Sequence, residues 1–328
     1  MTKNLLGKVA LVTGATRGIG KGIAIGLGEA GATIYITGRS LNTNTISSDN
    51  VSGTLLETKQ EVEKVGGICI PIQIDHSDDE QVKLLFERIE TEQNGQLDLL
   101  VNNVFSGVGA IANAYGQPFW KNTPSLWDAI NNVGLRSHYI ASVFAARLMI
   151  QRQKGLICTI SSWGGLSYIF GAAYGVGKAA CDRLAADMAV ELKPDNITSV
   201  SIWPGIVGTE HMLEFAEGLN NQDDIQSQDV TFRDNYNWET PLLTGRVIAS
   251  LLEQKNTINL TGKVQIVAEL AQQYRIVDED GKRPVSLRSL RFIVPNAIPG
   301  LRKYAWLIPD FKIPWFILQW RMLQSPKI

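Results

Sequence analysis

Tyr174 and Lys178 are the residues whose types and spacing first indicate chemistry, and they lie in the segment YGVGKAA. Two kinds of chemistry use such a segment. A phosphate loop of the form GxxxxGK[ST] would need a glycine at position 172 and a hydroxyl after the lysine, where Ala172 and Ala179 stand. A tyrosine one helical turn before a lysine can instead transfer protons, because an ammonium group stabilises a nearby phenolate. We therefore predict an acid–base pair on one face of a helix.

A hydroxyl that polarises the reacting oxygen would complete this group. The segment TISSWGG offers two candidates, Ser161 and Ser162, directly after a β-branched run. Side chains alternate between the two faces of a strand. Only one of these serines can therefore face the tyrosine easily.

Seven short apolar runs alternate with helical patterns and would position these side chains. The runs are KVALVTG, ATIYITG, ICIPIQID, LDLLVNN, GLICTISS, ITSVSIWPG and KVQIVAEL. Most lack an alternating polar face, which is typical of parallel strands covered by helices on both sides. The sequence predicts an α/β fold with a doubly wound, parallel seven-stranded sheet, the Rossmann fold, whose ligand site lies at the carboxyl ends of the strands.

The segment VTGATRGIGKGIA predicts a dinucleotide site at the end of the first strand. Gly14, Gly18 and Gly20 allow a tight turn and let pyrophosphate approach bare backbone at a helix N-terminus. The second strand ends in ITGRS, which has no acid for the ribose hydroxyls but carries Arg39, and Arg17 lies inside the glycine turn. Two guanidinium groups suit a 2′-phosphate, so we predict NADP(H) as the cofactor.

Together these motifs resemble the short-chain dehydrogenase/reductase family. The patterns TGxxxGxG, NN after the fourth run, ISS after the fifth, YxxxK, and PG after the sixth follow that family's order over residues 8–270. The resemblance implies that Tyr174 donates a proton to a carbonyl oxygen as hydride arrives from nicotinamide, and that Lys178 also holds the nicotinamide ribose. It favours Ser162, the second serine of the pair, as the third catalytic residue, and it implies no metal.

The resemblance also implies a set of cofactor contacts. Asp75, which ends the third strand, would hold the adenine amino group, and the segment PGIVGT (204–209) would seat the nicotinamide carboxamide. The expected cofactor-binding residues all lie at or near the carboxyl ends of the predicted strands: Gly14, Arg17, Gly18, Ile19, Gly20, Arg39, Asp75, His76, Asn102, Tyr174, Lys178, Pro204, Gly205, Ile206, Val207 and Thr209.

Two positions depart from the usual pattern of the family. Gly134 stands where the family has an asparagine that steadies a proton-relaying water, and Asn132 lies on another face of the helix and cannot simply replace it. Phe105 interrupts the usual Asn-Asn-Ala-Gly segment close to the expected nicotinamide. Both departures resemble a branch of the family that contains membrane-associated, NADPH-dependent carbonyl reductases.

Two polar segments interrupt the alternating pattern. Residues 40–53 predict a flexible insert after the second strand, and the acidic residues 218–239 predict a mobile lid over the substrate site. We expect a catalytic domain over residues 1–270 and a C-terminal extension over residues 271–328.

The last part of the chain, residues 286–328, is basic and rich in aromatic residues. It holds seven Lys or Arg residues against a single acid, Asp310, and its tryptophans are interleaved with Leu, Ile and Phe. This mixture favours peripheral contact with an anionic membrane. Its apolar runs are about half the ~20 residues that span a bilayer, so the segment would lie on the surface. A tail that packs over the substrate pocket or on a partner subunit is the alternative.

Composition bounds the remaining possibilities. The 328 residues are 45% hydrophobic and 19% charged, as in globular proteins, and the net charge of -1 gives no reason to expect nucleic acid. Three scattered cysteines predict a reducing compartment, not disulfides or a metal site, and the N-terminal apolar run is too short for a signal peptide. We expect a homo-oligomer in the cytoplasm or at the cytosolic face of a membrane.

The predicted function is that of an NADPH-dependent carbonyl reductase that also runs the reverse alcohol oxidation. Side chains near the predicted site, such as Phe105, Trp163, Tyr168 and Phe170, favour a bulky lipophilic ketone or aldehyde, steroid-like or xenobiotic. A second hypothesis is motivated by Gly134: a catalytically weak, NADP-binding scaffold or sensor with the same fold.

Overall fold

The structure is a computed structural model, and it describes residues 3–42, 52–220 and 236–323. The predicted insert and the predicted lid fall largely in residues 43–51 and 221–235, so most of both lies outside the described residues. The described ends of the predicted lid belong to a helix on one side and to a short strand on the other.

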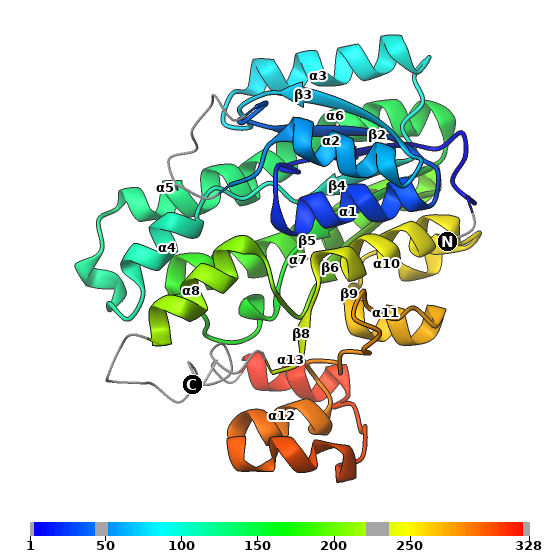
Figure 1. Ribbon diagram of the computed structural model, residues 1–328. Helices are drawn as coiled ribbons and strands as arrows, with labels where there is room; N and C mark the ends of the chain where they lie inside the picture. Colours follow the sequence, from blue (N-terminus) through cyan, green and yellow to red (C-terminus); the bar gives the residue numbers. More distant parts are fainter. Residues whose placement is uncertain (1–2, 43–51, 221–235, 324–328) are drawn as a thin grey trace.

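Seven parallel strands form one sheet at the centre of the molecule, in the spatial order β3-β2-β1-β4-β5-β6-β9 (Figure 1). The chain order reverses beside β1, as in a doubly wound sheet. The strands are β1 Val9–Val12, β2 Thr33–Gly38, β3 Ile68–Gln73, β4 Leu99–Asn102, β5 Gly155–Ile160, β6 Ile197–Trp203 and β9 Val264–Ile266. Each lies within one of the seven apolar runs, so the predicted Rossmann fold is confirmed.

Helices cover both faces of the sheet. Helices α1, α2, α10 and α11 pack on one face, and α3, α6 and α7 pack on the other. Their bounds are α1 Gly18–Glu29, α2 Leu55–Lys64, α3 Asp79–Glu92, α6 Ser137–Arg152, α7 Ala172–Leu192, α10 Pro241–Glu253 and α11 Val267–Tyr274. Because apolar side chains face helices on both sides, the strands need no polar face.

Helix α1 crosses α10 so closely that backbone touches backbone. A Cβ on Gly22 would lie 2.2 Å from the carbonyl carbon of Pro241, and one on Gly26 would lie 2.4 Å from that of Gly245. No larger residue fits at these positions without movement of the helices. The crossing holds α1, whose first turn begins at the predicted dinucleotide site, against the C-terminal half of the sheet.

Smaller elements gather at the carboxyl edge of the sheet, where the predicted motifs end. They are α4 Val108–Ala114, η1 Phe119–Lys121, α5 Ser125–Asn131, η2 Asn132–Arg136, η3 Trp163–Gly165, β7 Ile206–Val207, α8 Glu210–Asn220 and β8 Trp238–Glu239. Strands β7 and β8 pair in parallel as a separate two-stranded sheet. Two further turns, η4 Lys193–Asp195 and η5 Thr257–Leu260, lie in other loops.

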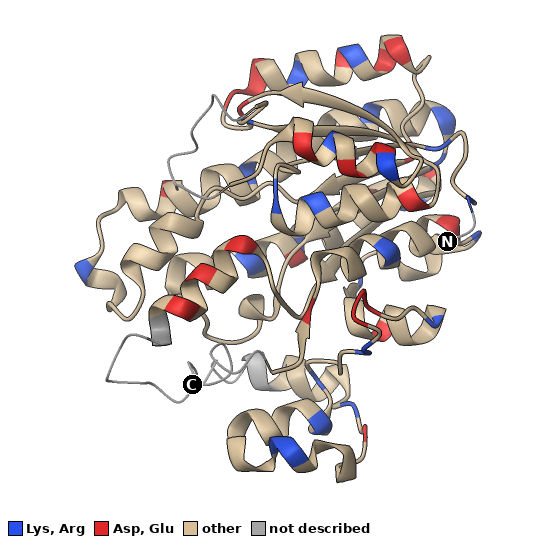
Figure 2. Cartoon of the chain, viewed as in Figure 1, with Lys and Arg blue, Asp and Glu red and all other residues tan. Residues whose placement is uncertain are grey.

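The C-terminal extension forms a further layer, drawn in orange and red at the bottom of Figure 1. It contains α12 Leu290–Ala297, η6 Pro299–Leu307 and α13 Trp315–Leu323. Basic residues dominate the charges on this layer (Figure 2). The predicted boundary at residue 270 falls inside α11, which packs on the sheet. Among the described residues, no helix is both long enough and apolar enough to span a membrane.

Candidate active site

A cavity of about 1830 Å³ opens at the carboxyl ends of the strands. Its lining includes the glycine turn after β1, both Tyr174 and Lys178, part of α8 and part of the C-terminal extension. All the site residues predicted from the sequence line it, except Asn102. Ligand sites usually measure about 300–1,000 Å³. The cavity can therefore hold a dinucleotide together with a second bulky ligand.

Ser162 and Tyr174 meet in this cavity. Ser162 follows β5 and caps η3, and its Oγ lies 2.9 Å from the Tyr174 hydroxyl oxygen. The Gly164 amide donates to the same Oγ at 3.1 Å, which fixes the serine side chain. Ser161 is turned away and donates to the backbone carbonyl of Lys178 at 2.9 Å. Of the two serines, only Ser162 is brought to the tyrosine hydroxyl.

Lys178 lies one turn beyond Tyr174 on α7, and its side chain is buried. Its ammonium group donates to the carbonyl of Ile160 at 3.2 Å. The same group lies 5.1 Å from the ring centre of Phe105 and 5.9 Å from that of Tyr174, so the aromatic faces stabilise its charge. A phenol that shares a hydrogen bond with a serine beside an ammonium group can transfer a proton to a ligand oxygen.

Phe105 occupies the space of the side chain that Gly134 lacks. Gly134 lies at the kink η2 between α5 and α6, where the backbone is not helical, with φ of 155°. A Cβ there would lie 2.6 Å from Cδ2 of Phe105. The ring also stands edge-on to Tyr174, with 6.1 Å between ring centres. The two departures from the family pattern therefore form one feature: with this ring in place, asparagine does not fit at position 134.

Asn131 is a buried residue of the site that the sequence analysis missed. Its Nδ2 donates to the Ala173 carbonyl at 3.3 Å. Its Oδ1 packs so tightly on α7 that a Cβ on Gly177 would lie 2.1 Å away. Asn131 thus supports the turn of α7 that separates Tyr174 from Lys178. Asn131 ends α5, and the kink at Val133 and Gly134 that follows it has no local sequence signal that would have pointed to this contact.

The glycine turn after β1 fits an anionic ligand. Gly14 has φ of 69°, and a Cβ on Gly20 would lie 2.2 Å from the Gly14 carbonyl oxygen, so neither position admits a side chain. The Gly18 amide, in the first turn of α1, donates to the Glu210 carboxylate at 2.9 Å. That carboxylate stands where helix N-termini bind the pyrophosphate of a dinucleotide. Glu210 is far away in the sequence, and nothing in its neighbourhood indicated this contact.

Arg39, Asp75 and His76 line the part of the cavity next to the ends of β2 and β3. Burial would raise the pKa of Asp75, but hydrogen bonds from the Ser77 amide and hydroxyl bring that pKa below its ordinary value. Burial lowers the pKa of His76 to about 4, and its Nε2 lies 2.7 Å from the Thr37 hydroxyl. At neutral pH this part of the cavity therefore holds a charged carboxylate and a neutral imidazole.

Asn103, and not the predicted Asn102, reaches the cavity. Asn102 is fully buried, and its Nδ2 donates to Oγ of Ser142 on α6 at 2.8 Å. The Nδ2 of Asn103 donates to the carbonyls of Thr13 and Gly14, each at 2.9 Å, and so braces the glycine turn. The two residues point in different directions because side chains alternate along a strand. The side chain of Asn103, and not that of Asn102, therefore lies where a cavity ligand could contact it.

Segment 204–209 lines the cavity after β6 and is supported by Glu239. The Gly205 amide donates to Oε2 of Glu239 at 2.9 Å, and a Cβ on Gly205 would lie 2.6 Å from Oε1. Burial raises the pKa of Glu239 to about 8. Oγ1 of Thr209 accepts from the Met212 amide at 3.2 Å, at the start of α8. Glu239 lay inside the predicted lid, so its supporting role was not foreseen.

The described part of the chain offers neither a metal-binding cluster nor a reactive thiol. It contains no cluster of three or more His, Cys, Asp or Glu side chains that could hold a metal ion. Burial raises the pKa of the Cys69 thiol to about 12 and that of Cys181 to about 11. Burial also raises the pKa of Cys158, so none of these thiols is a reactive thiolate.

Comparison with known proteins extends over nearly the whole chain. The profile of the family described as short chain dehydrogenase matches residues 8–220. The chain is 43% identical to dehydrogenase/reductase SDR family member 1 of Mus musculus, over 97% of this chain and 98% of that protein. It is 31% identical to NADPH-dependent aldehyde reductase 2, chloroplastic, of Arabidopsis thaliana, over 69% of this chain and 81% of that protein.

A solved structure shows the same similarity in three dimensions. A short-chain type dehydrogenase/reductase from Mycobacterium marinum matches with a TM-score of 0.64 at 25% identity, over 80% of this chain and 95% of that chain. The predicted resemblance to the branch that contains dehydrogenase/reductase SDR family member 1 is confirmed by this identity. The chain belongs to the short-chain dehydrogenase/reductase family of oxidoreductases, which bind nicotinamide cofactors.

Proposed function

We propose that this protein is an NADPH-dependent carbonyl reductase that also oxidises alcohols in the reverse direction. The observation that carries the proposal is the 2.9 Å contact between the Ser162 and Tyr174 hydroxyls beside the buried ammonium group of Lys178. When bound, the cofactor supplies hydride for the carbonyl carbon.

Each of the three side chains then has a distinct role. Ser162 donates a hydrogen bond to the carbonyl oxygen and polarises it. Tyr174 gives its proton to the same oxygen, which becomes the alcohol hydroxyl, and it is left as phenolate. Lys178 holds positive charge beside that phenolate and so offsets the charge that develops. In the reverse direction, Tyr174 takes the proton back.

A preference for NADP(H) over NAD(H) is supported by the charges beside the end of β2. Arg17 and Arg39 both line the cavity, and β2 ends at Gly38 without an acid. Guanidinium groups bind a phosphate through charge-assisted hydrogen bonds. The name of the Arabidopsis relative, an NADPH-dependent reductase, agrees with this preference. We expect Arg39→Ala to weaken binding of NADPH and to leave binding of NADH nearly unchanged in a fluorescence titration.

The substrate class follows from the apolar side chains beyond the acid–base group. Phe105, Trp163 and Phe170 line the cavity, and Phe170 stands edge-on to Tyr174 with 5.5 Å between ring centres. Aromatic walls favour a bulky lipophilic ketone or aldehyde, steroid-like or xenobiotic.

The deciding experiment is oxidation of NADPH with a panel of lipophilic ketones. Tyr174→Phe removes only the hydroxyl, and acid–base groups contribute about 10²–10⁴ in rate, so we expect a loss of that size. Tyr168→Phe is the matched control, because Tyr168 lines the same cavity and its side chain is 45% exposed. Equal rates for wild type and Tyr174→Phe would refute the proposal.

A catalytically weak scaffold or sensor is the alternative function. It is motivated by Gly134, because the asparagine of the usual proton relay is missing. A scaffold would bind NADPH with ordinary affinity and would show no turnover with any ketone of the panel. The same titrations and assays therefore separate the two functions.

Peripheral contact with an anionic membrane is our proposal for the outer surface of the extension. Exposed aromatic residues such as Trp306, Phe316 and Trp320 support it. Some of the basic residues are engaged inside the molecule, since Arg288 pairs with Glu269, and this reduces the charge that faces outward. Such contact would place the protein at the cytosolic face of a membrane.

Liposome sedimentation tests the membrane proposal. We expect the protein to sediment with anionic vesicles and Trp306→Ala/Trp320→Ala to stay in the supernatant. A wild-type protein that stays in the supernatant in the presence of anionic vesicles would exclude the membrane contact.

We also propose a homo-oligomer, as is common in this family, and light scattering after gel filtration measures its mass.

A further inference from the structure

The C-terminal extension lines the same cavity as the acid–base group. Leu287, Phe292, Asn296, Ala297 and Pro299 all contribute to the lining. They lie beyond the residues that match the family profile, which end at position 220. This chain therefore adds its own surface to a cavity whose catalytic side is that of the family.

Phe292 is the largest side chain of this added surface, and its neighbours hold it in place. It is 8% exposed, and its ring stacks on Tyr236 with 6.1 Å between ring centres and 11° between ring planes. The Tyr236 hydroxyl donates to the Arg291 carbonyl at 3.2 Å, and the guanidinium group of Arg302 lies 4.9 Å from the Tyr236 ring centre. A ring packed in this way presents a preorganised apolar surface to a ligand.

Three tryptophans connect the extension to the turn that carries Ser162. Trp315 of α13 stands edge-on to Trp203 at the end of β6, with 5.8 Å between ring centres, and Trp203 stands edge-on to Trp163 at 5.9 Å. Nε1 of Trp203 donates to the buried Asp182 carboxyl group at 2.8 Å. Because Trp163 directly follows Ser162, Trp203 links the extension to the catalytic turn.

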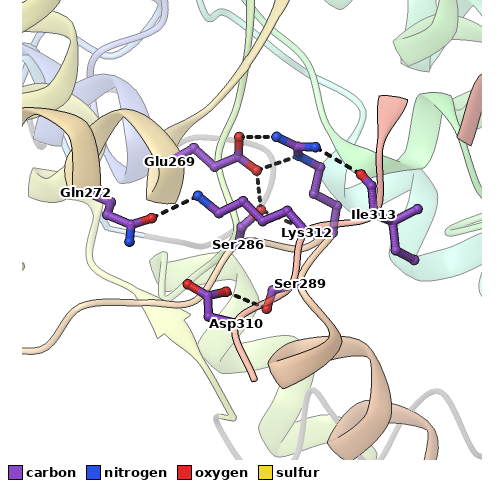
Figure 3. A network of polar contacts seen from close by, with 8 residues as sticks. Glu269, Gln272, Ser286, Ser289, Asp310, Lys312 and Ile313 are labelled. Atoms are coloured by element: carbon purple, nitrogen blue, oxygen red, sulfur yellow. Dashed lines mark hydrogen bonds and ion pairs between the residues drawn. The ribbon is translucent and has the colours of Figure 1, made fainter. Parts of the chain in front are cut away.

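A polar network fixes the extension to helix α11 (Figure 3). Arg288 donates to both carboxylate oxygens of Glu269, at 2.6 and 2.8 Å, and to the Ile313 carbonyl at 2.9 Å. Lys312 donates to Oε1 of Gln272 at 2.8 Å. A bidentate, partly buried ion pair holds its partners in a single geometry. The extension is therefore anchored at two places, by the tryptophans and by this network.

We propose that the extension is the distal wall of the substrate cavity and that Phe292 selects elongated, apolar carbonyl compounds. This proposal rests on the reductase function proposed above. The cavity of about 1830 Å³ exceeds what one ligand usually fills, so a dinucleotide leaves room for a long second ligand. The carbonyl group of that ligand meets Tyr174, and its far end meets Phe292. A short substrate reaches Tyr174 without contacting this wall.

A series of 4-alkylacetophenones, with alkyl groups from methyl to octyl, tests the wall. For each member, binding is measured by calorimetry in the presence of NADP⁺, and kcat/KM is measured with NADPH. We expect Phe292→Ala to lower the ratio of the values for the longest and shortest members about tenfold, because an apolar contact is lost only with the long members. Ala297→Trp, which fills part of the cavity, should also disfavour the longest members.

Phe311→Ala is the matched control, since Phe311 belongs to the extension, is 58% exposed and is not part of the cavity lining. Its length profile should equal that of wild type, and all variants should still bind NADPH. If Phe292→Ala and Phe311→Ala show the same dependence on alkyl length, the proposal that Phe292 forms the distal wall is wrong. Weaker binding of long members to Phe292→Ala, without any turnover by wild type, would keep the wall and refute the reductase function. Binding of no member to wild type would overturn the wall as well.

Discussion

At the scale of single residues, the ring of Phe105 changes how the acid–base group exchanges protons with its surroundings. The space enclosed by Phe105, Gly134, Tyr174 and Lys178 has no room for a water molecule. We therefore expect the proton of Tyr174 to be replaced from the side of the open cavity, without the water chain that the family's asparagine supports.

Substitution of Gly134 tests whether the Phe105 ring fills the space that a side chain at position 134 would need. We expect Gly134→Asn to lower the free energy of unfolding by about 1–3 kcal/mol and to reduce kcat/KM, because the new Cβ collides with Phe105 at a positive φ. Phe105→Ala makes room, so the double variant should recover part of both losses. A double-mutant cycle measures this coupling. Strictly additive effects would show that the two residues do not share one space.

Glu210 allows a second prediction at this scale. Its carboxylate accepts from the Gly18 amide at 2.9 Å and must leave when a phosphate oxygen binds there. We expect Glu210→Gln to tighten NADPH binding about 2- to 10-fold, because a neutral amide competes less well at a helix N-terminus. Glu217→Gln, an exposed residue of the same helix, serves as the control. Weaker binding by Glu210→Gln would contradict the competition.

At the scale of elements, the crossing of α1 and α10 depends on the absence of side chains. We expect Gly26→Ala to lower the free energy of unfolding by about 1–3 kcal/mol, because its Cβ would lie 2.4 Å from the Gly245 carbonyl carbon. Urea unfolding followed by circular dichroism measures the change. Gly218→Ala in α8, where a Cβ would meet nothing within 4 Å, should leave stability unchanged or raise it.

The elements that the sequence predicted are those with a local signature. Seven β-branched runs and the glycine turn predicted the sheet and the dinucleotide site, because strand preference and turn geometry are written in neighbouring residues. The kink at Gly134 and the support of Gly205 by Glu239 depend on contacts between distant segments. The sequence also did not show that the side chain of Asn103, and not that of Asn102, lines the cavity, because the pattern of a strand does not tell which of two neighbouring side chains faces the site.

At the scale of the whole molecule, two buried histidines reduce stability in acid. Burial lowers the pKa of His76 to about 4 and that of His138 to about 3, from 6.5 in the unfolded chain. Between pH 6.5 and these values, the unfolded chain binds protons that the folded protein does not bind. Each histidine therefore lowers the free energy of unfolding as the pH falls, by up to about 1.4 kcal/mol per pH unit. Glu239, whose pKa is raised from 4.5 to about 8, acts in the opposite direction between these two pH values.

Replacement of one histidine measures its contribution to the pH dependence of the free energy of unfolding. His138→Gln keeps a group that can donate to the Val104 carbonyl, which lies 3.0 Å from Nε2 of His138. Below pH 6 we expect its stability to fall less steeply than that of wild type, by about 1.4 kcal/mol per pH unit. Above pH 7 the two curves should run parallel. Parallel curves over the whole range would contradict the assignment.

The role of the extension could be predicted from the sequence only as a set of alternatives. Composition indicated a basic, aromatic tail that could contact a membrane, pack on a partner subunit or pack over the chain's own pocket. The packing of Trp315 on Trp203 and the pairing of Arg288 with Glu269 join segments that no local pattern connects. The structure shows that residues of the extension line the pocket. Other aromatic side chains of the extension are exposed, and the liposome experiment tests whether they contact a membrane.

The glycine crossing of α1 and α10 also has a consequence for synthesis on the ribosome. The first helix to emerge packs on residues 241–253, which are among the later ones to be made. Until then, Ile23 and Leu27 of α1, which are fully buried in the folded protein, lack part of their cover. The nascent chain thus carries an incompletely covered apolar helix until residues 241–253 are made. The cofactor turn comes first in the sequence, yet it is among the last parts to reach its final surroundings.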